Sequence, residues 1–534
     1  MKKYLLIMIA SLIFGGSVFA QTTHWTCDDS QCPNTMPVAF WVTLDGNYLG
    51  HTQIPDSQYD IDIEVAAFIV NEENEECRMT TFLYNLASEL PHLYVFKGVQ
   101  YKDGELGATV KFKMFIHSTG KEYDMCDFSA TISENGYVNP EAPVVLPFHT
   151  YFTKTITPYT VVETDGEDKA NHWYLIASPI GTVSPEDVTN MLSNSYDLYY
   201  YDQTQEKEWK NYKANQFDLV PGKGYLYANS GDNGNAVTLT FVGTPYNNTG
   251  QVTLVYDAGA NQNTDLIGWN LVGNPFPETA YIDRSFYRMN EYGTDLESYS
   301  GAIASMEGVF VKATSASDNS LTFSTSSSKG SEQLIVSLSQ NRGASIDRAI
   351  VCFNEGDVLP KFMLNENNTK LYIPQGDHDY AVVRSAAQGE FPLNFRASEN
   401  GTYTLHIDTE NVDMNYLHLI DNMTGMDVDL LQTPSYSFEA KVNDYESRFR
   451  LVFATNKEDS VSTGSKAFAF FSNGNWIINN DSKATLQIVD INGRVLCNEQ
   501  INGCYSKSFE AAPGVYMLRL INGDNVKVQK LVVR

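Results

Sequence analysis

The sequence predicts an all-β protein that consists of several β-sandwich modules in series and ends in a small C-terminal β-sandwich. Short runs rich in Val, Ile, Tyr, Phe and Thr recur between clusters of Gly, Asn, Asp and Pro, as strands do between turns. Residues 110–116 and 403–408 alternate apolar and polar side chains, which is typical of half-buried strands. Long amphipathic helical patterns are nearly absent, and only residues 185–192, after a capping Ser184, are predicted to form a helix.

Length and charge limit the possible partners. The chain has 534 residues, too many for one ordinary core, so about three or four domains are expected. Its 36 basic and 65 acidic residues give a formal net charge of -29. Because this charge repels nucleic acid and anionic membranes, no nucleic-acid partner is expected. The acidity is typical of an exposed, well-solvated surface.

The N-terminus has the three regions of a secretory signal peptide. Two lysines follow Met1, residues 4–14 form an apolar run too short to span a bilayer comfortably, and residues 18–20 offer a cleavage end. We predict a signal peptide at residues 1–20, cleaved before Gln21. No later stretch has the length of a membrane helix and the residue after the cut is not a cysteine. We therefore expect neither a membrane-spanning segment nor a lipid anchor.

The mature chain is expected to divide into immunoglobulin-like β-sandwich modules. Polar stretches that are poor in apolar residues supply the boundaries. The predicted parts are an N-terminal β module at 22–150, a middle β domain at 165–328, a β-sandwich module at 332–454, a linker at 455–466 and a C-terminal domain at 467–534. Residues 324–331, rich in Ser, Thr, Gly and Lys, are predicted to form a flexible joint.

An internal repeat marks the middle domain. The run Trp-Tyr-Leu-Ile-Ala-Ser-Pro at 173–179 returns as Trp-Asn-Leu-Val-Gly-Asn-Pro at 269–275. Each copy is followed by a glycine-led aromatic or apolar run, at 224–228 and at 308–313. The spacers differ in length while the order is kept, so two related halves are expected to build one β domain.

The seven cysteines all follow the predicted cleavage point, and export permits disulfide bonds. Spacing favours three pairs, although it does not determine the connectivity. The favoured pairs are Cys27 with Cys32, Cys77 with Cys126, and Cys497 with Cys504. The remaining Cys352 lies in an apolar run, where we expect a small buried hydrophobe rather than a reactive thiol.

No catalytic residue, metal site or cofactor is predicted. The chain lacks a His-Glu-x-x-His motif, a Gly-x-Ser-x-Gly elbow and a phosphate-binding glycine loop. Its nine histidines are scattered, and His406 and His418 fall in strand-like runs where a structural role is favoured.

Acidic residues offer two candidates for a calcium or acid/base site. Asp60, Asp62 and Glu64 alternate along one predicted strand, where a solvated strand face is favoured over a functional site. Residues 421–425 resemble a calcium loop only loosely, because the alternating oxygen ligands and the closing glutamate are missing. A turn between strands explains them.

Aromatic residues supply the remaining candidate for a binding surface. The rings gather around Asp202 and belong to Tyr199, Tyr200, Tyr201, Trp209 and Tyr212. Tyr and Trp offer apolar area with a polar group, so they could stack on sugars or contact a partner. Strand alternation would bury about half of them, and core packing is favoured over a ligand platform.

The C-terminal domain carries the most specific pattern. Residues 486–495 form a strand, an Asn-Gly turn and a second strand, because this dipeptide tolerates the positive φ angles of a hairpin. Residues 513–520 give another strand with alternating apolar side chains, and the turn at 522–525 leads into a last strand at 526–533.

This order resembles the type A sorting domain of type IX secretion substrates, found in bacteria of the Bacteroidetes. The shared features are a D-x-x-G-R turn, a G-x-Y-x-L-x-L strand and a terminal strand with a basic residue before an apolar end. The matching residues are Asp490, Gly493, Arg494, Gly514, Tyr516 and Lys530. The resemblance implies a β-sandwich that is bound by the outer-membrane machinery of type IX secretion and is often removed on export. Ser460, within Asp-Ser-Val, resembles the short O-glycosylation acceptor of these bacteria.

The sequence therefore predicts an exported, non-catalytic surface protein whose β modules act in adhesion or ligand binding, with a host or glycan ligand that it does not identify. Two alternatives stay open. One is a secreted hydrolase of glycans or peptides with a site assembled from distant loops, and the other is a structural surface spacer.

Overall fold

The computed structural model describes most of the chain after the predicted signal peptide. The described residues are 22–28, 30–50, 54–55, 58–71, 74–85, 93–138, 144–164, 167–257, 259, 263–326, 331–341, 343–353, 358–386, 388–455, 468–472, 475–478, 480, 482–503, 505–508, 512–523 and 525–533. The predicted signal peptide, residues 456–466 of the predicted linker, Ser460 and Cys504 lie outside the described residues.

The described residues are almost entirely β, which confirms the predicted fold class. They form strands β1 to β43 and two single-turn 3-10 helices, η1 (Pro185–Asp187) and η2 (Thr264–Leu266). The strand predicted at 110–116 is β6 (Thr109–Ile116), and the strand predicted at 403–408 lies within β32 (Gly401–Glu410). Buried and exposed side chains alternate along both strands, as the sequence pattern predicts.

The helix predicted at 185–192 is wrong beyond its first turn. Ser184 does cap the start, because its side chain accepts a hydrogen bond from the N–H two residues later. The helix ends with η1, since Thr189 forms a bridge with Thr240 in which each N–H donates to the other residue's carbonyl, at 3.0 and 3.2 Å. A strand partner distant in sequence therefore replaces the hydrogen bonds of a continued helix.

The chain divides into two compact units. The first contains Met1–Lys154, Pro179–Met191 and Thr238–Tyr246, and the second contains Thr155–Ser178, Leu192–Val237 and Asn247–Arg534.

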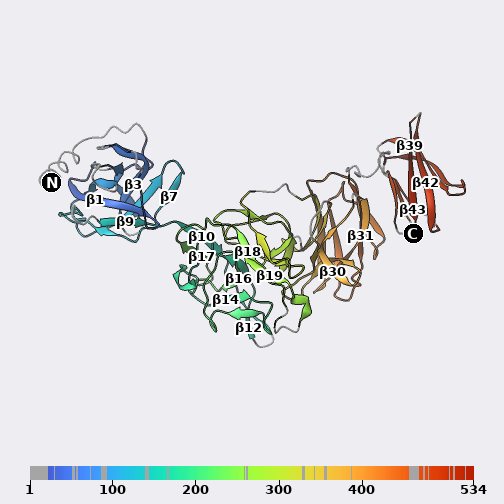
Figure 1. Cartoon of the computed structure of the whole chain (residues 1–534), viewed down its shortest axis with the longest axis horizontal. Coiled ribbons are helices and arrows are strands. Elements are labelled where there is room, and N and C mark those ends of the chain that lie inside the picture. The colour runs from blue at the N-terminus through green and yellow to red at the C-terminus, as the bar shows by residue number, and fades with distance from the viewer. Residues whose placement is uncertain are drawn as a thin grey trace. The chain divides into compact units, whose positions relative to one another are not determined.

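A nine-stranded sheet dominates the first unit (Figure 1, blue strands). Its order is β2-β1-β5-β4-β3-β6-β7, with β8 paired to β6 and β9 paired in parallel to β1. The bounds are β1 (Asn34–Leu44), β2 (Asn47–Tyr48), β3 (Tyr59–Asn71), β4 (Asn74–Tyr84), β5 (Tyr94–Tyr101), β6 (Thr109–Ile116), β7 (Lys121–Tyr123), β8 (Ala130–Thr131) and β9 (Val144–Phe148). Phe40, Val65, Phe112 and Phe148 lie fully buried in its core.

The second unit begins with two four-stranded sheets of the same connectivity. The first has the order β13-β16-β14-β15 and the second the order β19-β24-β21-β22. Their strands are β13 (Tyr174–Ala177), β14 (Tyr196–Tyr201), β15 (Trp209–Asn211), β16 (Gly224–Asn229), β19 (Trp269–Gly273), β21 (Phe286–Met289), β22 (Leu296–Tyr299) and β24 (Gly308–Lys312). The two copies of the sequence repeat thus take equivalent places, with β13 paired to β16 and β19 paired to β24.

Glycines let the two repeat sheets approach each other. A Cβ on Gly224 would lie 2.5 Å from the carbonyl oxygen of Val272, and one on Gly273 would lie 2.4 Å from the Cβ of Ala177. A bridge between Lys223 and Val272 joins the two backbones at this place. The two halves therefore pack as one body rather than as separate sandwiches.

Eight short strands among the described residues between 151 and 322 pair two by two beside the repeat sheets. They are β10 (Tyr151–Ile156), β11 (Val161–Thr164), β12 (Glu167–Ala170), β17 (Val237–Val242), β18 (Gln251–Thr253), β20 (Ala280–Tyr281), β23 (Ala302–Ile303) and β25 (Ser320–Thr322), which pair as β10-β17, β11-β12, β18-β25 and β20-β23.

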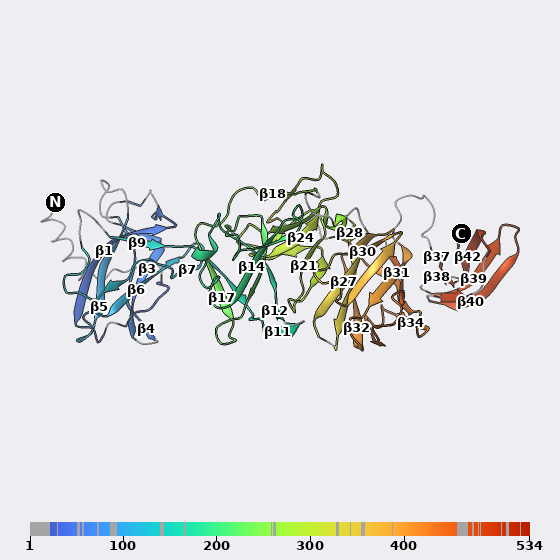
Figure 2. The ribbon, with the colours of Figure 1, turned by 90° about the horizontal axis from the view of Figure 1, so that it is seen from below.

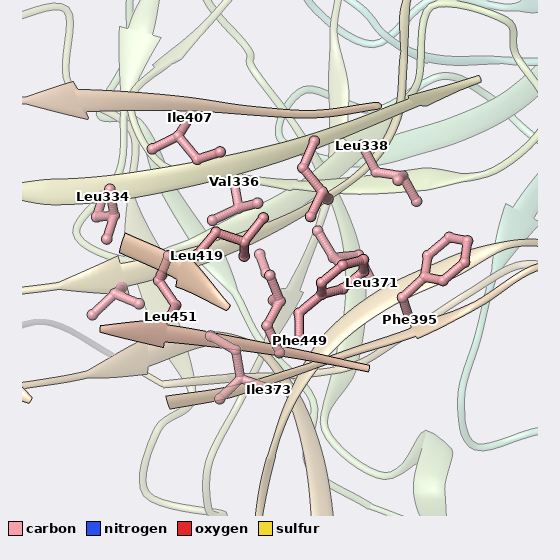
Figure 3. Packing of buried hydrophobic residues seen from close by; sticks show 14 of the residues in the cluster. Leu334, Val336, Leu338, Leu371, Ile373, Phe395, Ile407, Leu419, Phe449 and Leu451 are labelled. Carbon is pink, nitrogen blue, oxygen red and sulfur yellow. The ribbon is translucent and has the colours of Figure 1, made fainter. Parts of the chain in front are cut away.

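An eleven-stranded sheet follows, in the order β34-β33-β36-β31-β29-β30-β27-β26-β32-β35 with β28 on β30. The bounds are β26 (Gln333–Gln340), β27 (Ser345–Cys352), β28 (Leu359–Pro360), β29 (Lys370–Gln375), β30 (His378–Arg384), β31 (Gln388–Arg396), β32 (Gly401–Glu410), β33 (Met414–Asp421), β34 (Met426–Asp429), β35 (Ser435–Ala440) and β36 (Phe449–Thr455). The sheet encloses an apolar core in which Leu334, Ile373, Leu419 and Phe449 face one another (Figure 3). Cys352 is buried, 3% exposed, as predicted.

The repeat sheets and the eleven-stranded sheet contact each other directly, and residues 327–330 of the joint predicted between them lie outside the described residues. The Trp269 ring stacks on Phe362 with centroids 4.3 Å apart, and the Tyr287 hydroxyl donates to the carbonyl of Pro360 at 2.9 Å. Glu297, 3% exposed at its side chain, pairs with Arg348 at 3.1 Å. Contacts between residues far apart in sequence thus join the two regions directly.

The C-terminal region is a small two-sheet structure, as predicted. One sheet has the order β37-β38-β41 and the other β40-β39-β42-β43. Figure 2 shows β39, β40 and β42 side by side. The bounds are β37 (Ala469–Ser472), β38 (Asn475–Ile478), β39 (Lys483–Asp490), β40 (Val495–Asn502), β41 (Tyr505–Ser508), β42 (Gly514–Asn522) and β43 (Asn525–Val533). Leu486, Ile488, Leu518 and Leu520 fill the space between the sheets.

Candidate functional site

The hairpin turn between β39 and β40 is held by one carboxylate. Asp490 Oδ1 accepts hydrogen bonds from the N–H groups of Asn492 and Arg494, at 3.0 and 2.9 Å. Its Oδ2 lies 3.1 Å from Nε of Arg494. Gly493 has a φ of 81°, a conformation that favours glycine. The D-x-x-G-R motif is therefore a turn that its own residues stabilise. Asp490 accepts the hydrogen bonds, Gly493 takes the positive φ, and Arg494 supplies an N–H and a countercharge.

Strand register gathers the six motif residues at one end of this sheet. Asp490 on β39 pairs with Tyr516 on β42, which pairs with Leu531 on β43. Gly514 begins β42 opposite Val533 at the end of β43, and Lys530 pairs with Met517, one row beyond the Tyr516–Leu531 pair. The predicted residues are thus all brought together: Asp490, Gly493, Arg494, Gly514, Tyr516 and Lys530. The side chain of Arg494 is 76% exposed, so it is accessible to a partner while its Nε pairs with Asp490.

Two residues that support the position of Tyr516 and the pairing of the two sheets were not predicted from the sequence. Trp476 on β38 is fully buried and meets the Tyr516 ring edge-on, with centroids 5.0 Å apart. Gln529 on β43 accepts hydrogen bonds from the N–H groups of Phe468 and Ala469, at 2.5 and 2.7 Å, and so ties the two sheets together. The apolar run at 475–478 was the one signal that could have indicated Trp476.

Asp490→Ala is expected to loosen the turn. The N–H of Arg494 is the main cause that lowers the pKa of Asp490 below its ordinary value of 3.8. The carboxylate therefore stabilises the turn fully above pH 3.8, and this stabilisation is lost as the pH falls through the lower folded-state value. Near neutral pH, amide hydrogen exchange at Asn492 and Arg494 should be faster in the variant, with exchange in the β42–β43 hairpin unchanged. Unaltered exchange at both amides would contradict this account, and Gln487→Ala on β39 is the control.

The structure corrects the predicted pairing of the first cysteines. Cys27 is disulfide-bonded to Cys77, not to Cys32. The segment before β1 crosses β3 and β4, because the N–H of His24 donates to Glu64 on β3 at 2.7 Å. This path places Cys27 beside β4, whereas Cys32 lies with its Sγ 2.8 Å from Nη1 of Arg78.

The predicted disulfide between Cys77 and Cys126 is wrong, and the one between Cys497 and Cys504 stays a prediction. Cys126 is bonded to none of the cysteines that the structure describes, Cys77 included, and lies at a backbone bridge with Phe148. Cys497 is bonded to no described cysteine and is buried in the core of the C-terminal sheets. Its predicted partner, Cys504, lies outside the described residues. Register between distant strands, not spacing along the chain, decides which sulfurs meet.

The acidic run on β3 is not a solvated strand face. Asp60 is 1% exposed and Glu64 is 0% exposed. The register of β3 and β4 shifts between these two residues, which breaks the simple alternation. The Glu64 carboxylate accepts from the Thr80 hydroxyl at 2.5 Å and lies 2.8 Å from Nε2 of His117. We interpret the Glu64 carboxylate as a buried acceptor whose hydrogen bonds hold the N-terminal segment against the sheet.

The remaining histidine and carboxylate candidates have structural surroundings. His418 stacks on Tyr416 with centroids 4.2 Å apart and contacts Asp427, and His406 is an exposed residue 3.3 Å from Asp408. Residues 421–425 form the hairpin turn between β33 and β34, as predicted. Within the described ranges no cluster of three His, Cys, Asp or Glu side chains could hold a metal ion. No helix in the same residues is long and apolar enough to cross a membrane.

The aromatic run divides between a core and a groove. Tyr201 is 7% exposed and packs edge-on against Trp209 and Phe310, with centroids 5.2 and 5.1 Å apart. Tyr199 joins the same apolar cluster, and Tyr212 is also buried. Core packing, which the sequence favoured, thus accounts for four of the five rings, because Tyr201 and Tyr212 are buried and Tyr199 and Trp209 pack half-buried against the apolar cluster.

Tyr200 instead faces a groove of about 490 Å³ between the two repeat sheets. The groups that line it include Tyr200, Asp202, Lys223, Gln251, Thr253 and Asn270. The ammonium of Lys223 lies 3.9 Å from the centre of the Tyr200 ring. Burial lowers the pKa of Lys223, an effect that Asp202 partly offsets.

Comparison with known proteins places the C-terminal region in a family. Residues 472–534 match the model of the secretion system C-terminal sorting domain, so this region is a sorting domain of type IX secretion. A search of curated proteins finds no match. Among solved structures, the chain is similar to one titled "Biofilm associated protein - BSP domain", with 10% identity and a TM-score of 0.14, over 98% of this chain and 99% of that one.

Proposed function

We propose that this protein, whose C-terminal domain is a type IX sorting domain, acts outside the cell as a non-catalytic binding protein. The observation that carries the proposal is the match of residues 472–534, together with the turn built by Asp490 and Arg494. Such a domain implies an interaction with the type IX secretion machinery and delivery to the cell surface or the extracellular space. The predicted signal peptide at 1–20 would supply the preceding step across the inner membrane.

The binding role is supported by the architecture that precedes the sorting domain. Extended sheets provide rigid frames, and the groove between the repeat sheets is within the range of small-molecule sites, roughly 300–1,000 Å³. Its walls are held by backbone pairing between β13 and β16 and between β19 and β24. A preformed groove on a rigid scaffold suits recognition, because little conformational entropy is lost on binding.

Deletion of residues 472–534 in the native host tests the export step. We expect the truncated protein to stay in the periplasm, while the full chain reaches the surface or the medium, as followed by fractionation and immunoblot. The full-length Gln487→Ala variant, a substitution on β39 of the same domain, is the control and should be exported like the parent chain. If truncated and full-length proteins travel alike, the C-terminal domain has no sorting task in this chain.

Assays of the purified mature chain test the binding role. Immobilised neutral polysaccharide should retain the protein without release of reducing sugars, and a protein substrate should yield no peptides. Clear hydrolysis would replace the proposal by a secreted hydrolase. Self-assembly into regular polymers without any retained ligand would replace it by a structural spacer.

A further inference from the structure

The walls of the groove between the repeat sheets are fixed by amide side chains. Gln203 donates through its amide nitrogen to the carbonyls of Val255 and Trp269, both at 2.8 Å. Asn270 accepts from the N–H of Val255 at 2.8 Å and donates to the carbonyl of Gly268 at 2.8 Å. Because these amides are engaged with the backbone, they shape the groove rather than meet a ligand.

Two charged groups remain to face the groove, Lys223 and Asp202. The Lys223 ammonium lies over the Tyr200 ring and forms no ion pair with any carboxylate in the described residues. Asp202 Oδ1 accepts from the N–H and the hydroxyl of Thr204, at 3.0 and 2.7 Å. Its turn is thereby held in place, and Oδ2 retains acceptor capacity. The groove thus presents a donor beside an aromatic ring and an acceptor whose turn is held in place.

This combination fits the chemistry of a sugar. Neighbouring hydroxyls on a pyranose ring can donate to a carboxylate and accept from an ammonium at the same time, and the apolar face of the ring can lie against aromatic or aliphatic side chains. Gln251 and Thr253, which line the same groove from β18, add an amide and a hydroxyl for further contacts. We propose that the groove binds a neutral saccharide through adjacent hydroxyls held by Asp202 and Lys223, an inference that rests on the proposed binding function.

Charge selects a neutral ligand over a charged one. The chain carries a net charge of -29, which repels polyanionic glycans and acidic peptides at long range. Inside the groove an anion would meet Asp202, and a cation would meet Lys223. A ligand with many hydroxyls and no formal charge satisfies both groups without leaving either one opposed by a like charge.

Titration of the full mature chain with neutral oligosaccharides of glucose, galactose and mannose tests this inference. We expect at least one of them to bind, as measured by isothermal titration calorimetry and saturation-transfer NMR. Asp202→Asn and Lys223→Met should each weaken that binding about tenfold, because each removes a charge-assisted hydrogen bond. Lys213→Met is the matched control, since Lys213 lies 4.8 Å from the Tyr196 ring and pairs with Asp197 outside the groove.

The binding results of the two groove variants and the control variant support or overturn the proposed saccharide site. Thermal unfolding first establishes that the variants fold like the parent chain. Saccharide binding lost in both groove variants and kept in Lys213→Met supports the inference. Failure of every neutral oligosaccharide to bind, preference for oligogalacturonate, or binding kept in both groove variants overturns it. Retention on polysaccharide that survives Asp202→Asn and Lys223→Met would leave the proposed function standing with a site elsewhere.

Discussion

Arg448→Met is expected to lower the free energy of unfolding of the eleven-stranded sheet by about 3–5 kcal/mol, the usual result of breaking a buried ion pair. The side chains of Arg448 and Asp421 are 2% and 1% exposed, and Nη2 of the arginine lies 2.9 Å from Oδ2 of the aspartate. Nη1 donates to the carbonyl of Glu439 at 2.8 Å, and the guanidinium lies over the Phe438 ring at 4.5 Å. Removal of the arginine leaves a buried carboxylate without its countercharge.

A double variant separates the ion pair from simple loss of packing. Asp421→Asn combined with Arg448→Met removes both charges, so it should be more stable than Arg448→Met alone in urea-induced unfolding. Arg450→Met, at a more exposed pair with Glu390, is the control and should cost much less. Equal stability of Arg448→Met and the parent chain would show that the buried pair contributes nothing net.

The same pair predicts a dependence on acid. Burial by itself raises the pKa of Asp421, but hydrogen bonds from Arg448, the N–H of Met423 and Tyr436 bring it below the ordinary value of 3.8. The resulting stabilisation is present above pH 3.8 and is lost as the pH falls through the folded-state value. The difference between the parent chain and Asp421→Asn should therefore shrink in acid.

Gly273→Ala is expected to destabilise the joined repeat sheets by about 3 kcal/mol, at the upper end for an overpacked core. The added Cβ would lie 2.4 Å from the Cβ of Ala177 and 2.7 Å from the carbonyl oxygen of Lys223. Relief requires movement of backbone, because neither contact is the end of a flexible side chain. The two sheets would have to separate, and the groove between them would widen.

A strand glycine without such neighbours provides the control. A Cβ on Gly389, in β31, would meet its nearest neighbour at 3.6 Å, an ordinary contact. Gly389→Ala should therefore unfold close to the parent chain in thermal and denaturant scans. A Gly273→Ala protein of parental stability would mean that the two sheets can move apart at little cost, which would contradict their close packing at Gly273.

The sequence by itself determined the features that short windows encode. Alternation of apolar side chains identified β6 and β32, and the Asn-Gly dipeptide identified the hairpin of β39 and β40, since backbone preference and one-sided burial act over a few residues. The motif residues around Asp490 and Tyr516 were recognisable for the same reason. Their order along the chain is retained in a turn and its neighbouring strands.

Only the tertiary structure decided what depends on partners distant in sequence. It paired Cys27 with Cys77, buried Glu64, ended the helix after η1 and set Lys223 over Tyr200. Each of these outcomes follows from strand register and from the approach of one sheet to another. Such approaches bring together residues tens of positions apart, whose proximity leaves no trace in local spacing.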